Sequence, residues 1–416
     1  MTWRERRGGR SLWPIIALLW LIIALLWLPT RASAAGAPGV GVSPGADTTP
    51  GGTATAAPDG AASLDTREID RYLEEARLAT GGDVPQVTVG SLLSALVSGK
   101  GFSWRDLVGS LGQYLFGELI ANSRLLGRLV AIAILAAVLN NVQSAFGGGT
   151  AGKVAMMVTY LATASLALGS FALAFGTARG VIDRLVNFMQ ALLPTLMALL
   201  AANGGMVTVP LLHPLMVGTI SLASVMVRDI VLPMILVTAL LELVGNFSSS
   251  YKLDGVVSLL RYGAVTAMGL SMVLILGVAA VLKASGPVAD GVALRAGKFA
   301  ASTFIPVIGK MFADAAELVV GSTHVLLSAV GLAGAVGVSL IVLFPLVKLV
   351  AVILTYRIAG AVIQPVSDAG VVDLLNGTAN AVAMASVAVA AVAVLFFIGI
   401  TILMGASNAL LGLRQL

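Results

Sequence analysis

The chain has 416 residues and a net charge of +5; 58% of its residues are hydrophobic and only 11% are charged. A typical soluble domain has about 25% charged residues, so this composition excludes an ordinary soluble fold and predicts a protein whose surface faces lipid. Cysteine is absent and only two histidines occur, which argues against disulfides, thiolate nucleophiles and multi-histidine metal sites.

The N-terminus has the pattern of a secretory signal peptide. A start rich in arginine precedes a short apolar run at 15–28, and Ala32-Ser33-Ala34 fits the small-residue rule for cleavage after Ala34. The alternative is an uncleaved anchor helix, although this run is shorter than the roughly 20 residues that a full span needs. We therefore expect a signal peptide at 1–34 and a mature N-terminus that faces away from the cytoplasm.

Two extracytoplasmic regions are predicted next. Residues 35–62 are rich in Ala, Gly, Pro and Thr, cannot bury a core, and are expected to form a flexible linker. Residues 63–122 contain two helical patterns, each of which begins with a capping pair. The second of these helices lies either on the membrane surface or in a small helical bundle on the outer side.

Residues 123–416 are predicted to form an all-α polytopic membrane domain. The apolar runs 207–246 and 322–357 each exceed one bilayer crossing, so each is interpreted as a tight hairpin. The first would turn at Arg228-Asp229 and the second at Gly331, Gly334 and Gly337. The same three glycines, with many alanines, would also permit close helix approach. This interpretation gives about seven to eight transmembrane helices, with spans at 124–146, 154–176, 207–228, 229–246, 256–283, 322–339, 340–357 and 381–405. The distribution of Lys and Arg agrees moderately with an outward N-terminus.

Proline spacing indicates an internal repeat. Pro194 and Pro233 are 39 residues apart, as are Pro306 and Pro345, and the two pairs are offset by 112 residues. We predict two copies at about 124–228 and 229–340, followed by terminal helices. If the polar segment in each copy does not cross the membrane, the repeat is inverted, as in many transporters.

Each copy contains a less hydrophobic segment, 180–203 or 287–317, with a central proline. A proline in an apolar helix frees a backbone carbonyl that lipid cannot satisfy. The segment is therefore either an amphipathic helix in the interface or a broken, re-entrant helix, and both alternatives stay open. The candidate functional residues in these segments are Arg184, Asn187, Gln190, Pro194, Arg295, Lys298, Pro306, Lys310 and Asp314. Polar residues of the second segment fall on one helical face: Arg295, Lys298, Ser302, Lys310, Asp314 and Glu317. In the first segment Asp183, Asn187 and Gln190 form a weaker polar face.

Glu242 and Lys348 complete the candidate list, because both are charged residues within predicted spans. A charge at membrane depth costs about 2.5–3.5 kcal/mol on insertion scales, so it needs a partner or a water-lined cavity. Snorkelling or burial in an oligomer contact is the simpler explanation. Residues 381–394 are almost all small and would pack against a protein neighbour rather than lipid. This packing favours assembly, and a homo-oligomer is one such assembly.

No motif indicates catalysis or a cofactor. The Gly-Lys pairs at 152–153, 297–298 and 309–310 lack the rest of a phosphate-binding loop. Neither a nucleophile elbow nor a zinc-binding His-Glu-x-x-His helix occurs. We expect a protein that is not an enzyme, takes no cofactor or metal, and does not bind nucleic acid.

Several long motifs resemble one known family. They are ANSRLLGR at 121–128, NVQSAF at 141–146, FMQALLP at 188–194, KFAA at 298–301, FIPVIGKMFAD at 304–314 and AVIQP at 361–365, followed by Asp368. Over about residues 64–416 the chain resembles the stage III sporulation protein AE family. The family has no established catalytic residues to carry over.

The resemblance implies a role in endospore formation, in the mother-cell membrane that surrounds the forespore. It also implies partners: the other stage III sporulation operon A proteins and, indirectly, the forespore stage II sporulation protein Q. That complex is regarded as a channel or feeding apparatus, of which this chain would be the permease-like part. The alternatives are a self-sufficient secondary transporter and a membrane scaffold that anchors other sporulation proteins.

The polar face of the second copy leads to a first prediction. Charge reversal at Lys298 or Lys310 is expected to lower the number of heat-resistant spores more than charge reversal at Lys252, which is isolated in a short loop. Spore counts of a complemented host measure this difference. Equal counts for the two sets of variants would contradict a role for the polar face.

Overall fold

The computed structural model describes residues 71, 74, 104–145, 150–247, 253–277, 308–365 and 369–415. Within these ranges the chain is helical apart from short connections, and no strand occurs. The predicted all-α class is therefore confirmed. The predicted signal peptide and linker lie outside the described residues, as does most of the region 63–122.

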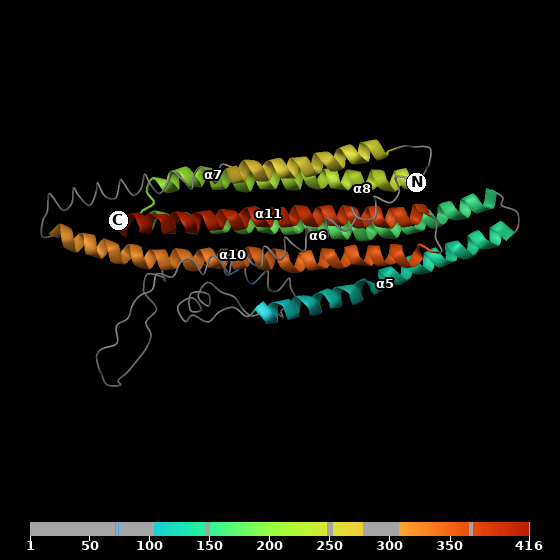
Figure 1. Ribbon diagram of the computed structural model, residues 1–416, viewed down its shortest axis with the longest axis horizontal. Coiled ribbons are helices and arrows are strands. Elements are labelled where there is room, and N and C mark those ends of the chain that lie inside the picture. The colour runs from blue at the N-terminus through green and yellow to red at the C-terminus, as the bar shows by residue number, and fades with distance from the viewer. Residues whose placement is uncertain are drawn as a thin grey trace, which may run out of the picture.

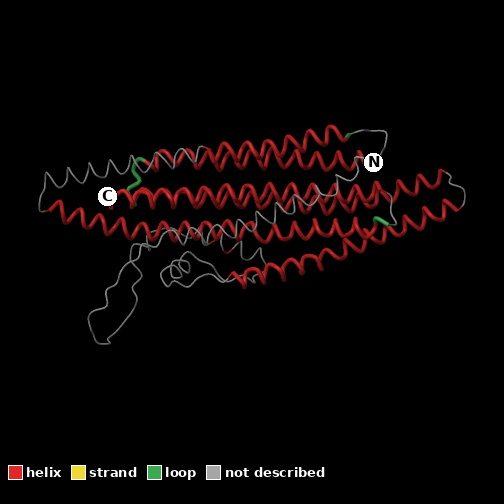
Figure 2. Tube along the Cα trace, viewed as in Figure 1, coloured by secondary structure: helices red, strands yellow, loops and turns green. Residues whose placement is uncertain are grey.

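Long helices lie side by side in one bundle (Figures 1 and 2). They are α5 (Trp104–Ala145), α6 (Thr150–Ala202), α7 (Thr208–Ala223), η2 (Ser224–Val231), α8 (Leu232–Phe247), the helix Asp254–Gly277, α10 (Ile308–Ile363) and α11 (Ala369–Gln415). Helices that follow one another across a connection run in opposite directions (Figure 1). We call the end of the bundle at which α10 meets α11 the α10–α11 end.

The hairpin predicted at Arg228-Asp229 is wrong. The segments α7, η2 and α8 follow one another without a gap from Thr208 to Phe247, and both charged residues lie inside η2. η2 is a π-helix, in which a backbone N–H donates to the carbonyl five residues earlier instead of four. It ends directly before α8, where Leu232 N–H donates to Val227 O and the next residue, Pro233, has no N–H to donate. The wider π-helical turn therefore accommodates Pro233 without a break in the helix.

The second predicted hairpin is also wrong, because α10 is one helix of 56 residues. Gly331, Gly334 and Gly337 lie three residues apart on one face of α10 and allow other helices to approach. A Cβ added at Gly331 would lie 2.6 Å from Sδ of Met404, one at Gly334 would lie 2.5 Å from Cδ2 of Leu192, and one at Gly337 would overlap the ring of Phe188. The expected close helix approach is confirmed, whereas the turn is not.

Five helices in the described part of the chain are long and apolar enough to cross a membrane: Met157–Ala202, Thr208–Gly245, Asp254–Gly277, Gly321–Ile363 and Gly370–Ser407. The predicted count of seven to eight depended on the two hairpins. At about 1.5 Å per residue, the 53 residues of α6 extend about 80 Å, whereas the hydrocarbon core is about 30 Å thick. The helices therefore tilt strongly or extend beyond the hydrocarbon core.

Loss of the hairpins changes the expected topology around 278–307. The helix Asp254–Gly277 starts at the α10–α11 end and runs away from it, so its C-terminus points toward the opposite end of the bundle, where α10 starts (Figure 1). The hairpin topology placed these two points on the same side as the connection between α5 and α6. The distribution of Lys and Arg therefore no longer supports an outward N-terminus, and only the signal-peptide pattern supports it. The predicted border between repeat copies falls inside η2, and the duplication stays a prediction.

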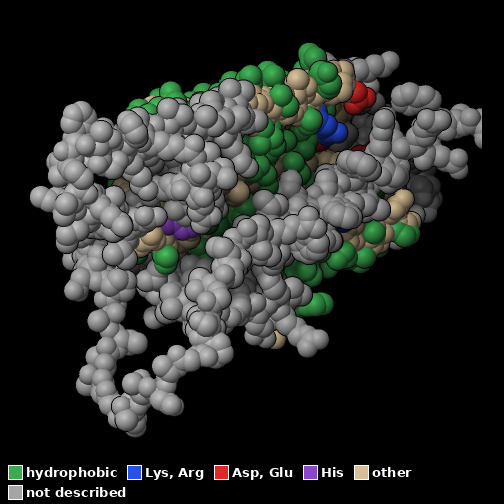
Figure 3. Space-filling model, turned by 60° about the vertical axis from the view of Figure 1, so that its left-hand side comes forward, with side chains coloured by type: hydrophobic (Ala, Val, Ile, Leu, Met, Phe, Trp, Pro, Cys, Tyr) green, Lys and Arg blue, Asp and Glu red, His purple; other side chains and the backbone are tan. Residues whose placement is uncertain are grey.

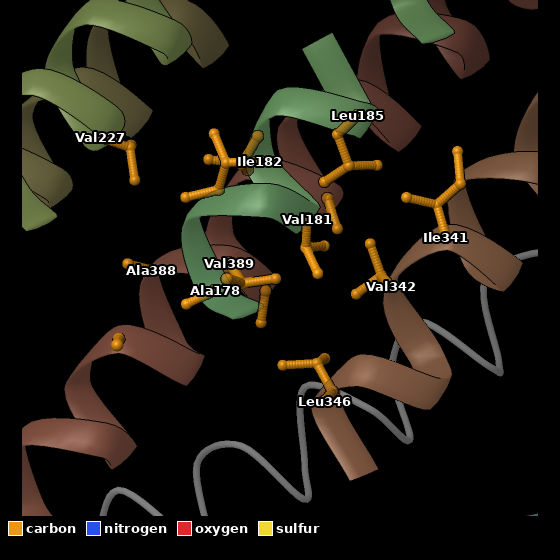
Figure 4. Close-up of a cluster of buried hydrophobic side chains, with 14 of the residues drawn as sticks. Ala178, Val181, Ile182, Leu185, Val227, Ile341, Val342, Leu346, Ala388 and Val389 are labelled. Atoms are coloured by element: carbon orange, nitrogen blue, oxygen red, sulfur yellow. The ribbon is translucent and has the colours of Figure 1, made fainter. Parts of the chain in front are cut away.

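The core of the bundle lies where α6, α10 and α11 meet. Figure 4 shows Val181 and Leu185 of α6 close to Val342 of α10 and Val389 of α11, and all four are buried. The small residues predicted at 381–394 thus pack against other helices of the same chain, because α11 contacts α6, α8 and α10. Lipid is as apolar as these side chains, so close van der Waals packing rather than water exclusion holds the helices together.

The glycine face of α10 yields a second prediction. Gly337→Ala is expected to destabilise the bundle by about 1–3 kcal/mol, because the new methyl group overlaps Phe188 in a packed core. Gly169→Ala on α6 is the matched control, since a Cβ there meets no atom within 4 Å and alanine favours a helix by about 1 kcal/mol. Thermal unfolding in detergent measures both variants, and equal melting temperatures would contradict the proposed packing.

Candidate functional site

Four of the predicted site residues lie together on one face of α6. Arg184, Asn187, Gln190 and Pro194 are all exposed, and their spacing of three and four residues places them on the same side of the helix. Arg179 is also exposed, one turn before Arg184. We call these five residues the α6 polar stripe. The opposite face of α6 is fully buried and apolar.

The helix continues through the stripe, since α6 includes Pro194 and extends to Ala202. Neither a broken re-entrant helix nor a separate interfacial helix is present in 180–202, so both predicted alternatives are wrong for the first copy. Pro194 leaves the carbonyl of Gln190 without its helical donor. Residues four apart share a face, so this carbonyl lies on the exposed side, where the helix need not break to satisfy it.

An ion cluster lies beside the stripe, at the middle of the helix Thr208–Phe247. Arg228 Nη1 of η2 lies 3.3 Å from Asp183 Oδ1 of α6, and Arg228 Nε lies 2.9 Å from Asp229 Oδ1. The three side chains are about two-fifths exposed. Sequence reasoning interpreted Arg228-Asp229 as a turn, because the third member is 45 residues upstream and no local pattern reveals it.

Glu242 of α8 forms an ion pair with Arg261 of the neighbouring helix. The Glu242 side chain is 18% exposed, and its second oxygen, Oε2, is buried without a hydrogen-bond partner. A Cβ added at Gly377 of α11 would lie 2.9 Å from this oxygen. A glycine at 377 thus leaves the space that the carboxylate occupies.

Arg357 of α10 lies near the same end of the bundle and bonds to the same part of α11. Its guanidinium donates to Asn376 Oδ1 at 3.1 Å and to Asn380 Oδ1 at 2.7 Å. These two asparagines flank Gly377, so four helices contribute to one polar region near the α10–α11 end. We call Glu242, Arg261, Arg357, Asn376 and Asn380 the α11 polar layer. Among the side chains that Figure 3 colours by type, basic and acidic groups lie close together beside hydrophobic ones.

Glu242 and Lys348, which the sequence singled out together, have separate partners. Lys348 Nζ of α10 lies 3.9 Å from Glu118 Oε1 of α5. Both candidates are therefore in ion pairs within the chain, which supplies the partner that a charge at membrane depth needs; snorkelling or an oligomer contact stays a prediction. Only Glu242 of the α11 polar layer was predicted. Signals for the rest were the charges of Arg261 and Arg357 within the predicted spans 256–283 and 340–357, and the spacing of Asn376 and Asn380, four residues apart.

The candidates of the second copy are described only in part. Arg295, Lys298 and Pro306 lie outside the described residues. Lys310 and Asp314 lie in the first turns of α10, and their side chains lie outside the described set. In the described ranges, no three acidic or histidine side chains are grouped as metal ligands would be.

Comparison with known proteins points to one family. The family model for stage III sporulation protein AE matches residues 87–407. A relative from Bacillus subtilis (strain 168), stage III sporulation protein AE, is 34% identical over 348 residues, which cover 84% of this chain and 87% of the relative. No solved structure matches.

The α11 polar layer yields a third prediction. Arg261→Met is expected to destabilise the bundle by about 1–3 kcal/mol, because it leaves the largely buried Glu242 carboxylate without its donor. Adding Glu242→Gln should recover part of the loss, since the neutral amide has a smaller desolvation cost. Thermal unfolding in detergent gives the double-mutant cycle.

Lys348→Met is the control for this cycle. Its ion pair is long and the lysine side chain is 49% exposed, so a change of only about 0–1 kcal/mol is expected. If Lys348→Met and Arg261→Met lowered the melting temperature equally, the special importance of the buried pair would be lost.

Proposed function

We propose the following function for this chain, which belongs to the stage III sporulation protein AE family and therefore acts in sporulation. It is a non-enzymatic membrane component of the channel complex between mother cell and forespore. Within that complex it would be the permease-like part. Its place would be the mother-cell membrane around the forespore, with the mature N-terminus extracytoplasmic. Its partners would be the other stage III sporulation operon A proteins and, indirectly, the stage II sporulation protein Q.

The α6 polar stripe is the observation that carries this proposal. It lies inside the candidate span Met157–Ala202, yet its side chains are exposed. Polar side chains at membrane depth face protein or a water-filled cavity rather than lipid, and they mark transport pathways. Both environments require an assembly around this face, which supports a component of a larger complex over an isolated lipid-embedded bundle.

Two other functions predict different results. A self-sufficient secondary transporter would move a solute when the purified chain alone is placed in liposomes. A scaffold would lose its operon partners when the stripe is altered, because the stripe would then be a binding surface. A channel component should retain its partners and still fail to support the forespore.

The stripe supplies the fourth prediction. Replacing Asn187 and Gln190 together by leucine is expected to lower the yield of heat-resistant spores by about tenfold or more, because it makes an essential polar surface apolar. The host is a spore-former that lacks its own family member and expresses the variant. The amount of protein in the membrane and its co-purification with the operon A proteins should stay at the level of the unaltered chain.

Thr401→Val on α11 is the matched control. It also replaces a partly exposed polar group in a candidate span, but its hydroxyl only donates to Phe397 O, four residues back in its own helix. Normal spore numbers are expected. Loss of spores together with loss of the partners would support the scaffold instead, and normal sporulation of the leucine variant would refute the role of the stripe.

A further inference from the structure

The exposed face of α6 changes its chemistry along the helix. Up to residue 173 it carries large apolar side chains: Val154, Met157, Val158, Leu161 and Leu173. Between 174 and 202 no large hydrophobic residue of α6 is exposed. The exposed residues there are Gly176, Arg179, Arg184, Asn187, Gln190, Pro194, Ala198 and Ala202. Only the first of these two parts resembles a surface that faces lipid.

Lipid cannot supply the hydrogen bonds that the exposed polar groups between residues 174 and 202 require. Asn187 and Gln190 carry amides that need hydrogen-bond partners, and Pro194 leaves the Gln190 carbonyl without one. Arg184 forms no ion pair or hydrogen bond within the described part of the chain. It is 18 residues before the end of α6, about 27 Å along the axis, which is too far for its side chain to reach the end of the helix.

The charges near the stripe leave an excess of positive charge. Arg228 pairs with both Asp183 and Asp229, and Arg179 acts electrostatically on Asp229. With Arg184 included, the three arginines in or beside the stripe outnumber the two carboxylates Asp183 and Asp229. Arginines that line a pore favour anions over cations.

We propose that the α6 polar stripe lines a water-filled passage that prefers small anions, with Arg184 as the residue that sets this preference. The inference rests on the proposed function and assigns it a lining and a substrate class. The stripe lies on the outside of a single bundle, so further copies of this chain close the passage. Identical stripes carry the same excess charge and repel one another, so water lies between the copies rather than a dry contact.

The absence of cysteine from the whole sequence allows a direct test. Single cysteines are placed at Asn187→Cys and Gln190→Cys in the full chain, expressed with its operon partners in sporulating cells. Membranes are treated with two methanethiosulfonates that differ in charge, one anionic (sulfonatoethyl) and one cationic (trimethylammonioethyl). These reagents react with the thiolate, which forms in water.

Leu173→Cys is the matched control, since this residue lies on the same exposed face of the same helix and is 76% exposed. Labelling at 187 and 190 is expected to be about tenfold or more faster than at 173. Equal rates at the three positions would overturn the water-filled passage. So would an oxidative cross-link between copies at 187 without labelling, because it indicates a dry contact.

The second arm tests the anion preference. In the unaltered background the anionic reagent should react faster at 187 than the cationic one. Adding Arg184→Gln should lower the ratio of the two rates about threefold or more, because one nearby charge is lost. An unchanged ratio would overturn the role of Arg184. Labelling is read independently of spore counts, so failure of this inference is distinguishable from failure of the proposed function.

Discussion

Lipid offers no hydrogen bonds, and the placement of most polar groups in the described part of this bundle follows from that constraint. The long helices satisfy their own backbones. The charges within them are mostly placed against one another, as in Glu242 with Arg261 and Arg228 with Asp183. Two tyrosines follow the same rule across helices: Tyr160 donates to Leu243 O at 2.6 Å, and Tyr356 donates to Ala167 O at 2.9 Å. These bonds link α6 to α8 and to α10.

Close packing of the helices also holds the bundle together, and it depends on small residues. Three glycines of α10 receive Met404, Leu192 and Phe188 from its neighbours, and the alanines of α11 let this helix lie between α6, α8 and α10. The α6 polar stripe is the exception to both rules. Apart from the electrostatic interaction of Arg179 with Asp229, it has no charged partner within the described part of the chain, and for that reason it is the most informative surface described.

Composition and periodicity were sufficient to predict the class of fold, the polar face of α6 and the close approach at the glycines of α10. They failed at Arg228-Asp229, where two charges resembled a turn because their third partner, Asp183, is distant in sequence. They failed at the α10 glycines for a related reason: three residues that permit a turn also permit contact, and only the neighbouring helix decides between these. Glu242 was found from its charge alone, and Arg261 carried the same signal within the predicted span 256–283. Their pairing, and the place of Asn376 near them, could not be predicted, because contacts across helices leave no local pattern. The repeat and the polar face of 287–317 stay predictions.

The π-helical segment Ser224–Val231 sets the rotational phase of everything after it. A π-bulge accommodates one extra residue in a helix, and one residue corresponds to about 100° of rotation at about 3.6 residues per turn. Glu242 faces Arg261 only because this extra residue has been absorbed eleven positions earlier. The same residues wound as a regular α-helix would turn this carboxylate by about 100°, away from Arg261. A one-residue deletion that removes the bulge would therefore leave Glu242 aimed at Arg261, whereas a deletion between the bulge and Glu242 would turn the carboxylate toward a different neighbour.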